Sequence, residues 1–304
     1  DMTDEDIRDL FSTGRFSVGH DYRIIQGTEV IVICVPTPLS ERLTPDLTYV
    51  TDAVKGILPY LRSGQLVVLE STTYPGTTEQ LLRPLIESRG LTVGGDVALA
   101  YSPERIDPGQ KRLALDKIPK VVSGVTPACT AYVKRVYETA FERVVVVSEP
   151  KVAEMAKLLE NCQRYVNISL MNEMAMLCEV LDIDLWETIA AAKTKPYGFT
   201  PYYPGPGVGG HCIPVDPLYL LWLAKRHVFN LKFIEAAQQI NEQMPSFVVS
   251  KTVKHLSRIK PPEKSRILVI GVTYKKDVGD IRESPALKVI EQLKLNVLNV
   301  EDVP

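Results

Sequence analysis

Five short apolar runs alternate with helical patterns in the first half of the chain, and this alternation limits the possible folds more than any other feature. The helical patterns cover Val50–Leu61, Thr77–Arg89 and Pro127–Ala140. The apolar runs are Val30–Val35, Leu66–Leu69, Val97–Tyr101, Lys120–Ser123 and Val144–Val147. Strands this apolar are buried on both faces, which predicts a parallel sheet with helices on both sides. We therefore expect an α/β fold with a Rossmann-like domain over residues 1–149, opened by a short acidic helix over residues 1–11.

Three loops follow the strands of this predicted sheet and mark where a ligand is expected. In open parallel sheets, ligands bind at the carboxyl ends of the strands. The loops are Pro36–Pro38, Ser71–Gly76 and Ser102–Pro108.

The pattern changes at Pro150, which suits the first turn of a helix. Residues 151–181 contain no glycine or proline and predict one long helix. An apolar stripe along it is wide enough to pack against another helix: Ala156, Leu159, Val166, Leu170 and Met174. Shorter helical patterns follow over Leu185–Lys193, Leu218–Lys225 and Phe233–Glu242. Residues 150–258 therefore predict a central helical domain, of a kind that often mediates dimerisation.

Pro261 and Pro262 mark a linker to a third region over residues 259–304. A strand over Ser265–Val272 leads into a basic, glycine-containing loop. Ser284 and Pro285 predict an N-cap and first helical position for a helix over Ala286–Leu293. This order fits either a phosphate cradle or an ordinary turn with exposed lysines. We expect this region to begin a second, incomplete Rossmann-like domain.

A stiff loop of glycines and prolines, residues 202–211, leads to Cys212. Such a loop can hold a thiol close to backbone N–H groups, and Asp216 adds a carboxylate four residues later. Two interpretations remain open, a nucleophile for covalent catalysis or a structural turn with an incidental thiol. Residues 205–210 also match G-x-G-x-x-G, but no strand precedes them and prolines follow at once, so we reject a dinucleotide fingerprint.

Composition excludes several classes of function. The net charge is −2, with no basic run for nucleic acid and no apolar stretch long enough to span a membrane. Five cysteines without C-x-x-C spacing indicate reduced thiols in a cytoplasmic protein. His211 adjoins Cys212, but neighbouring residues rarely bind one ion alone, so we predict no metal site.

Taken together, the loops resemble those of the nucleotide-sugar 6-dehydrogenases, the UDP-glucose and GDP-mannose dehydrogenase family. The resemblance covers essentially the whole chain. It rests on six ordered segments: Val35–Pro38, Glu70–Thr73, Tyr101–Arg105, Glu154–Asn161, Gly209–Asp216, and Gly271–Asp277 with Arg282–Pro285. The sequence of residues 194–212 is most similar to the branch of the family that acts on UDP-N-acetylglucosamine. UDP-N-acetylmannosamine and UDP-glucose are the alternative substrates.

The chain departs from the family at its two ends. Family members begin with a strand, a glycine-rich loop and an acidic ribose-binding residue, and they continue past the position of Pro304. We therefore expect this sequence to be a subset of a longer protein. If it were complete, cofactor binding would be in doubt.

The resemblance implies oxidation of the sugar C6 hydroxyl to a carboxylate with two NAD⁺, without release of the aldehyde. Cys212 would trap the aldehyde as a thiohemiacetal that becomes a thioester. Lys157 and Asn161 would stabilise the oxyanion, and Glu104 would be the base for the hydrolytic water. Thr72 and Asp216 would order that water.

Further residues are implied to bind cofactor or substrate. NAD would contact Val35, Pro36, Thr37, Pro38, Ser71, Thr72, Thr73 and Arg282. The UDP-sugar would contact Glu104, Arg105, Lys157, Asn161, Tyr203, Gly205, Gly207, Gly209 and Lys275. The resemblance also implies a cytoplasmic homodimer that serves polysaccharide biosynthesis, such as O-antigen or capsule.

Two readings from other classes compete with this one. A catalytically silent nucleotide-sugar-binding homologue would not need Cys212, Lys157, Asn161, Glu104 and Asp216 together. A Cys/His hydrolase would need His211 as base, but in an extended loop His211 points away from Cys212 and no orienting third group is evident.

Overall fold

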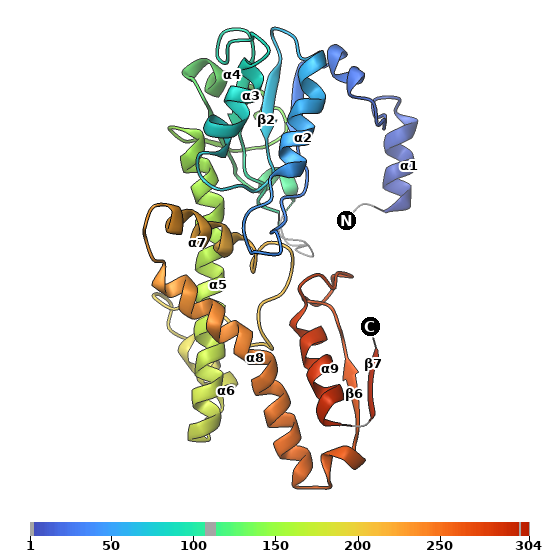
Figure 1. Cartoon of the computed structure of the whole chain (residues 1–304), viewed down its shortest axis with the longest axis vertical. Coiled ribbons are helices and arrows are strands. Elements are labelled where there is room, and N and C mark those ends of the chain that lie inside the picture. The colour runs from blue at the N-terminus through green and yellow to red at the C-terminus, as the bar shows by residue number, and fades with distance from the viewer. Residues whose placement is uncertain (1–2, 107–113, 298, 304) are drawn as a thin grey trace. The chain divides into compact units, whose positions relative to one another are not determined.

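The computed structural model describes residues 3–106, 114–297 and 299–303 of the chain (Figure 1). It divides into two compact units, Asp1–Leu158 and Leu159–Pro304, and each is described by itself. The boundary falls inside one helix, α5 (Pro150–Leu181), which contributes residues to both units.

The first unit is built on a five-stranded sheet in the order β1-β2-β3-β4-β5. Its strands are β1 (Val30–Ile33), β2 (Leu66–Leu69), β3 (Ala98–Tyr101), β4 (Lys120–Gly124) and β5 (Val144–Val146). Neighbouring strands are parallel except β3 and β4, which pair antiparallel. The α/β class is confirmed, while the expectation of a wholly parallel sheet is wrong at this one pair. In an antiparallel pair the second strand begins at the edge where the first one ends, whereas a parallel pair needs a crossover connection between opposite edges.

The antiparallel register of β3 and β4 accounts for the position of Glu104 opposite Lys120. Ala100 pairs with Gly124 and Tyr101 with Ser123. Each step along β3 corresponds to one step backwards along β4, so the same register continued past β3 sets Glu104 opposite Lys120. The start of β4 therefore lies at the edge where the parallel strands β1, β2 and β3 end.

Helices cover both faces of this sheet, as predicted. On one face, Val67, Leu69 and Leu99 pack in a cluster with residues of α2 (Thr48–Ile57) and α3 (Arg83–Glu87). On the other face, Leu66, Val68 and Ala100 pack with residues of α4 (Pro127–Tyr137). This alternation follows the two-residue period of a strand.

The remaining helical segments of the first unit are short. α1 (Asp4–Ser12) begins with a capping box in which the side chains of Thr3 and Asp6 bond each other's backbone N–H. The helix predicted over residues 77–89 is divided into a π-helical segment, η3 (Thr78–Leu82), and α3, with Pro84 in the first turn of α3. The 3-10 segments are η1 (Tyr22–Gly27), η2 (Leu58–Tyr60) and η4 (Leu115–Lys117).

The second unit contains most of α5, then α6 (Leu185–Ala192), α7 (Asp216–Arg226) and α8 (Lys232–Ser257). The long helix over residues 151–181 is confirmed. The predicted end of the next long helix at Glu242 is wrong, because α8 continues through Pro245 to Ser257. Proline removes one N–H and clashes with the carbonyl of residue i−4. Here the apolar side chains beyond it, such as Val249, are buried against Val289 and Leu293, and this packing offsets the defect.

The buried side of α5 differs from the predicted stripe. Residues that point inward include Leu158, Cys162, Tyr165 and Ser169. From the stripe, Leu159 and Leu170 are 62% and 46% exposed. The expectation that this stripe packs on a helix is therefore not met within one chain.

The end of the chain adds a two-stranded parallel sheet of β6 (Arg266–Ile270) and β7 (Asn299–Val303), joined through α9 (Pro285–Asn296) and preceded by η5 (Pro262–Lys264). Ser284 occupies the N-cap position of α9, but its side chain makes no capping hydrogen bond. The expectation of a serine cap is thus only half right. Within the described residues, no helix combines the length and the apolar character needed to cross a membrane.

Candidate active site

The two predicted cofactor loops of the first unit are joined where β1 and β2 end. The hydroxyl of Ser71 donates to the carbonyl of Val35 at 2.7 Å, and Thr37 is buried beside this junction. The side chain of Thr73 is fully buried, and its hydroxyl has no hydrogen-bond partner among the described residues. A buried hydroxyl without a partner is a position where a bound group can supply one. The loops Val35–Pro38 and Ser71–Thr73 therefore fit a polar cofactor.

A buried carboxylate, Glu154 on α5, holds the second of these loops. Its two oxygens accept hydrogen bonds from the N–H of Gly76 at 2.5 Å and of Thr78 at 2.9 Å, and from the Thr78 hydroxyl at 2.7 Å. Burial raises the pKa of the Glu154 carboxyl, and the three donors oppose that rise. Glu154 opens the segment Glu154–Asn161 quoted for the family resemblance, yet its role as a loop anchor was not predicted.

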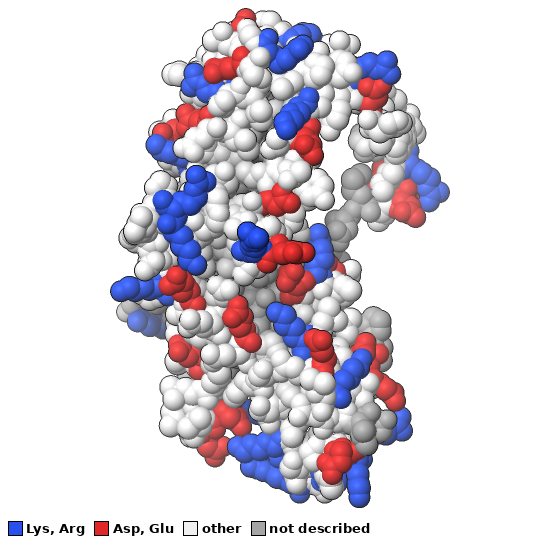
Figure 2. Space-filling model, in the orientation of Figure 1, with Lys and Arg blue, Asp and Glu red and all other residues white. Residues whose placement is uncertain are grey.

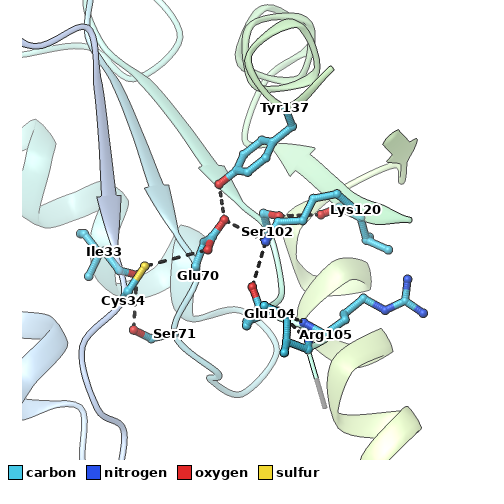
Figure 3. A network of polar contacts seen from close by, with 11 residues as sticks. Ile33, Cys34, Glu70, Ser71, Ser102, Glu104, Arg105, Lys120 and Tyr137 are labelled. Atoms are coloured by element: carbon cyan, nitrogen blue, oxygen red, sulfur yellow. Dashed lines mark hydrogen bonds and ion pairs between the residues drawn. The ribbon is translucent and has the colours of Figure 1, made fainter. Parts of the chain in front are cut away.

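Charged side chains meet at the same sheet edge (Figure 3). The ammonium of Lys120 lies 2.9 Å from Oε1 of Glu70 and 3.4 Å from Oε2 of Glu104. Oε1 of Glu104 accepts from the N–H groups of Arg105 and Ile106, each at 2.6 Å. The structure thus places Glu104, the predicted base, at the carboxyl edge of the sheet as expected. Lys120 and Glu70 were missed as site residues, although a lysine opening an otherwise apolar strand is a detectable signal.

Two further groups complete this network. The hydroxyl of Tyr137 donates to Oε1 of Glu70, and the thiol of Cys34 lies 3.9 Å from Oε2. Burial, followed by the charge of Glu70, raises the pKa of Cys34 to about 11. Burial likewise raises the pKa of Tyr137 well above its usual range. Both groups therefore keep their protons at neutral pH and act as donors to Glu70.

In the second unit, Cys212 lies one turn before α7. Its carbonyl accepts from the N–H of Asp216 at 2.9 Å, and its side chain is exposed. Asp216 is buried, and its Oδ2 accepts from Nδ2 of Asn161 at 2.5 Å. The structure therefore pairs the predicted amide with the predicted carboxylate, and it places the backbone of Cys212 one helical turn before that carboxylate.

His211 differs from its expected orientation. Its Nδ1 lies 3.9 Å from Sγ of Cys212, so the ring does not point away from the thiol. Burial lowers the pKa of His211, with a smaller contribution from Arg282, so the imidazole is neutral at pH 7. A neutral ring at this distance is a weak partner for the thiol. Among the described residues, no three His, Cys, Asp or Glu side chains cluster as a metal site would require.

The glycines before Cys212 allow close packing of the loop against residues 274–285. A Cβ on Gly209 would lie 2.7 Å from the carbonyl oxygen of Glu283 and 2.7 Å from Cδ of Pro285. A Cβ on Gly210 would meet the ring of Tyr274 at 2.8 Å, at a φ of +96°. Close approach to other parts of the protein thus accounts for these glycines.

This packing gives a prediction for the loop. We expect Gly209→Ala to destabilise the protein by roughly 1–3 kcal/mol, because a backbone oxygen and a proline ring must both move. Gly205→Ala is the matched control, since its nearest neighbour would be an ordinary 3.7 Å contact with the carbonyl of Gly207. Denaturant unfolding of the two variants measures the difference. Equal stabilities would show that the loop does not pack as described.

Hydrogen-bonded side chains, two of them buried and one half-buried, hold the start of the same loop. The N–H of Gly205 donates to Oδ1 of Asn172, whose Nδ2 donates to Oδ1 of Asn241 at 2.8 Å. Nδ2 of Asn241 then donates to the hydroxyl of Ser169 at 2.6 Å. The ring of Tyr203 stacks on Trp186 at 5.5 Å between centroids. These partners were not predicted, because they come from helices distant in sequence.

Other predicted residues have structural contacts of their own. The guanidinium of Arg282 bonds Asp280, with Nη2 2.7 Å from Oδ2, and the backbone carbonyl of Arg282 accepts from Gly210. Nη1 of Arg105 donates to the carbonyl of Pro119 at 2.8 Å. Gly207 packs near the carbonyl of Asn241, and the carbonyl of Lys275 accepts from the hydroxyl of Thr273. Roles of these residues toward ligands stay predictions.

Lys157 on α5 is buried, and its ammonium makes no ion pair with any other described residue. A buried cation without a counter-ion is costly unless a ligand provides one.

On the face shown in Figure 2, acidic and basic side chains are interspersed, in agreement with the near-zero net charge.

Three models of one protein family match the chain in order. The UDP-glucose/GDP-mannose dehydrogenase family's NAD binding domain matches residues 2–141, its central domain residues 151–243 and its UDP binding domain residues 268–302.

Individual relatives agree with these matches. The chain is similar to a UDP-N-acetyl-D-mannosamine dehydrogenase of Methanocaldococcus jannaschii, at 39% identity over 87% of this chain and 59% of the relative. It is similar to a UDP-N-acetyl-D-glucosamine 6-dehydrogenase of Pseudomonas aeruginosa, at 38% identity over 95% of this chain and 68% of the relative. A solved UDP-D-ManNAc dehydrogenase from Pyrococcus horikoshii superposes with a TM-score of 0.92 at 35% identity, covering 98% of this chain and 71% of that one. The chain spans 59–63% of the length of three curated relatives.

Proposed function

The chain belongs to the UDP-glucose/GDP-mannose dehydrogenase family, and from this premise we propose that it oxidises the C6 hydroxyl of a UDP-N-acetylhexosamine to a carboxylate with NAD. The observation that carries the proposal is the exposed thiol of Cys212, one helical turn before the buried Asn161–Asp216 pair. Covalent capture of an aldehyde requires an accessible nucleophile in a segment that polar contacts hold in place.

The proposed sequence of steps balances four electrons. The loops Val35–Pro38 and Ser71–Thr73 would hold NAD⁺, which would supply the hydride acceptor for each of the two oxidations of the sugar carbon. Between them the Cys212 sulfur adds to the aldehyde carbon, and the resulting thiohemiacetal carries the second hydride on a tetrahedral carbon. The thioester formed is cleaved by water, which adds to the carbonyl carbon and releases the carboxylate and the thiol.

Asn161 and Lys157 are proposed to stabilise the oxyanion of these tetrahedral species. The amide of Asn161 has two N–H groups, and the bond from one of them to Asp216 fixes the direction of the other. Lys157 contributes a buried positive charge four residues earlier on α5. A fixed donor and a buried cation favour charge that develops in the transition state over charge in the ground state.

Glu104 is proposed as the base that takes a proton from the hydrolytic water, with Thr72 and Asp216 ordering that water. About 45% of its side chain is exposed, so water can reach the carboxylate. Val35–Pro38 and Ser71–Thr73 are proposed to hold NAD, supported by the Ser71–Val35 bond and the unpartnered Thr73 hydroxyl. Arg282 is a further proposed NAD contact. Proposed contacts to the UDP-sugar are Arg105, Tyr203, Gly205, Gly207, Gly209 and Lys275.

The substrate is proposed to carry a 2-acetamido group, and its configuration at C2 is the open choice. The resemblance of residues 194–212 favours UDP-N-acetylglucosamine, and the Pseudomonas aeruginosa relative carries that name. The relatives from Methanocaldococcus jannaschii and Pyrococcus horikoshii carry the mannosamine name, which makes UDP-N-acetylmannosamine the second candidate.

We also propose a homodimer formed through α5. Leu159, Leu170 and Leu177 are exposed on this helix although they are large and apolar, which is typical of a surface covered by a partner. Light scattering of the purified protein tests this assembly, and a monomer at micromolar concentration would contradict it.

A panel of nucleotide sugars tests the proposed activity. The protein is mixed with NAD⁺ and UDP-N-acetylglucosamine, UDP-N-acetylmannosamine or UDP-glucose, and NADH absorbance is followed together with the sugar product. The proposal predicts two NADH per uronic acid with one of the acetamido sugars. Binding of these sugars without any NADH formation would support a silent homologue instead.

A further inference from the structure

We propose that Lys120 is a positioning residue for the hydrolytic step, because it fixes the Glu104 carboxylate by linking it to the anchored carboxylate of Glu70. This inference rests on the proposed function, in which Glu104 is the base. It concerns a residue on β4, outside every predicted catalytic or binding segment.

Lys120 is held more tightly than a surface lysine. Its side chain is 5% exposed, and its ammonium contacts both Glu70 and Glu104. The ammonium also lies 5.3 Å from the ring centroid of Tyr137 and 5.4 Å from that of Phe141. Two carboxylates and two aromatic faces leave the cation little freedom, because each of them favours the same position.

Glu70 is the fixed end of the link. It follows the last residue of β2 and directly precedes Ser71, and its side chain is only 14% exposed. Oε1 accepts from the Tyr137 hydroxyl as well as from Lys120, and Oε2 lies 3.9 Å from the Cys34 thiol. Figure 3 shows these side chains converging on Glu70 from different elements.

Glu104 is the exposed end of the link. The N–H groups of Arg105 and Ile106 fix Oε1, so the direction of Oε2 depends on Lys120. The same loop is tied to β4 a second time, because Arg105 donates to the carbonyl of Pro119. A base must point at its water within a narrow range, and a misplacement of about 1 Å can lower a rate about 100-fold.

The test uses a charge-balanced variant so that folding is preserved. Lys120→Met alone leaves two carboxylates close together, whereas Glu70→Gln with Lys120→Met removes one charge of each sign. Lys117→Met is the matched control, because Lys117 is an exposed lysine in the same segment and pairs with Glu142 instead. Circular dichroism confirms that each variant folds.

Stopped-flow NADH absorbance and peptide mass spectrometry then separate the steps. We expect the double variant to form two NADH per active site at the parental rate and then to turn over about 10–100-fold more slowly, with an acyl group accumulating on Cys212. The single variant Lys120→Arg, which keeps the positive charge, should retain most of the parental steady-state rate.

The outcomes are distinguishable. Equal slowing of the NADH burst and the steady state, or no slowing in a folded variant, would overturn the role of Lys120. If the parental protein itself forms no NADH, or only one per sugar, the proposed function fails first.

Discussion

Replacing Cys212 with serine is expected to abolish formation of the uronic acid while binding of the UDP-sugar is retained. Serine keeps the shape of the side chain, but its hydroxyl is a far weaker nucleophile than a thiolate toward the sugar aldehyde. Loss of a covalent nucleophile lowers turnover by roughly 10⁴-fold or more. Because the Cys212 side chain is exposed, and serine keeps the backbone carbonyl that bonds α7, the fold should be unaffected.

The measurement is product analysis by chromatography together with calorimetric binding of the UDP-sugar. Cys178→Ser is the matched control, since Cys178 is a free thiol on α5 outside the proposed site. At most one NADH per sugar should form in Cys212→Ser. Uronic acid produced at near the parental rate would end the covalent scheme.

Replacing Lys157 is expected to lower kcat by about 10²–10³-fold with a much smaller change in KM. The reason is that the buried ammonium is proposed to meet a negative charge that exists only in the tetrahedral species. Lys157→Met is the preferred change, because it keeps the volume of a side chain that is nine-tenths buried, and Lys157→Ala is its companion. Steady-state kinetics with the substrate identified in the panel gives both constants.

Lys151→Ala is the control for this experiment. Lys151 lies on the same helix but is exposed and pairs with Glu149 at 3.1 Å. A fall in kcat/KM that comes from a higher KM alone, with kcat unchanged, would make Lys157 a substrate-binding residue. Parental values of both kcat and KM would remove Lys157 from the mechanism.

The sequence predicted the secondary structure best where local composition decides it. The apolar run Leu66–Leu69 indicates a buried strand, and the glycine-free stretch of α5 indicates a helix, whatever the surrounding fold. It failed where tertiary packing overrides local preference. α8 continues through Pro245 because residues beyond it are buried against α9. The direction of β4 relative to β3 is set by pairing between strands, which local residue patterns do not encode.

The candidate site was predicted unevenly for the same reason. Cys212, Asp216 and Glu104 lie in short segments whose residue types already suggest chemistry, and the structure places each at a loop or helix start. Lys120 lies on β4, Tyr137 on α4 and Glu70 directly after β2, and only the topology brings them together. The lysine that opens the apolar run of β4 is a signal for Lys120 itself, but no spacing in the sequence shows which residues it meets.

The most direct test of the central proposal is the mass of the Cys212 peptide after rapid acid quenching of the protein during turnover. The proposal predicts that Cys212, and no other cysteine, gains the mass of the UDP-sugar acyl group. Continued formation of uronic acid with an unmodified Cys212 at every quench time would contradict it.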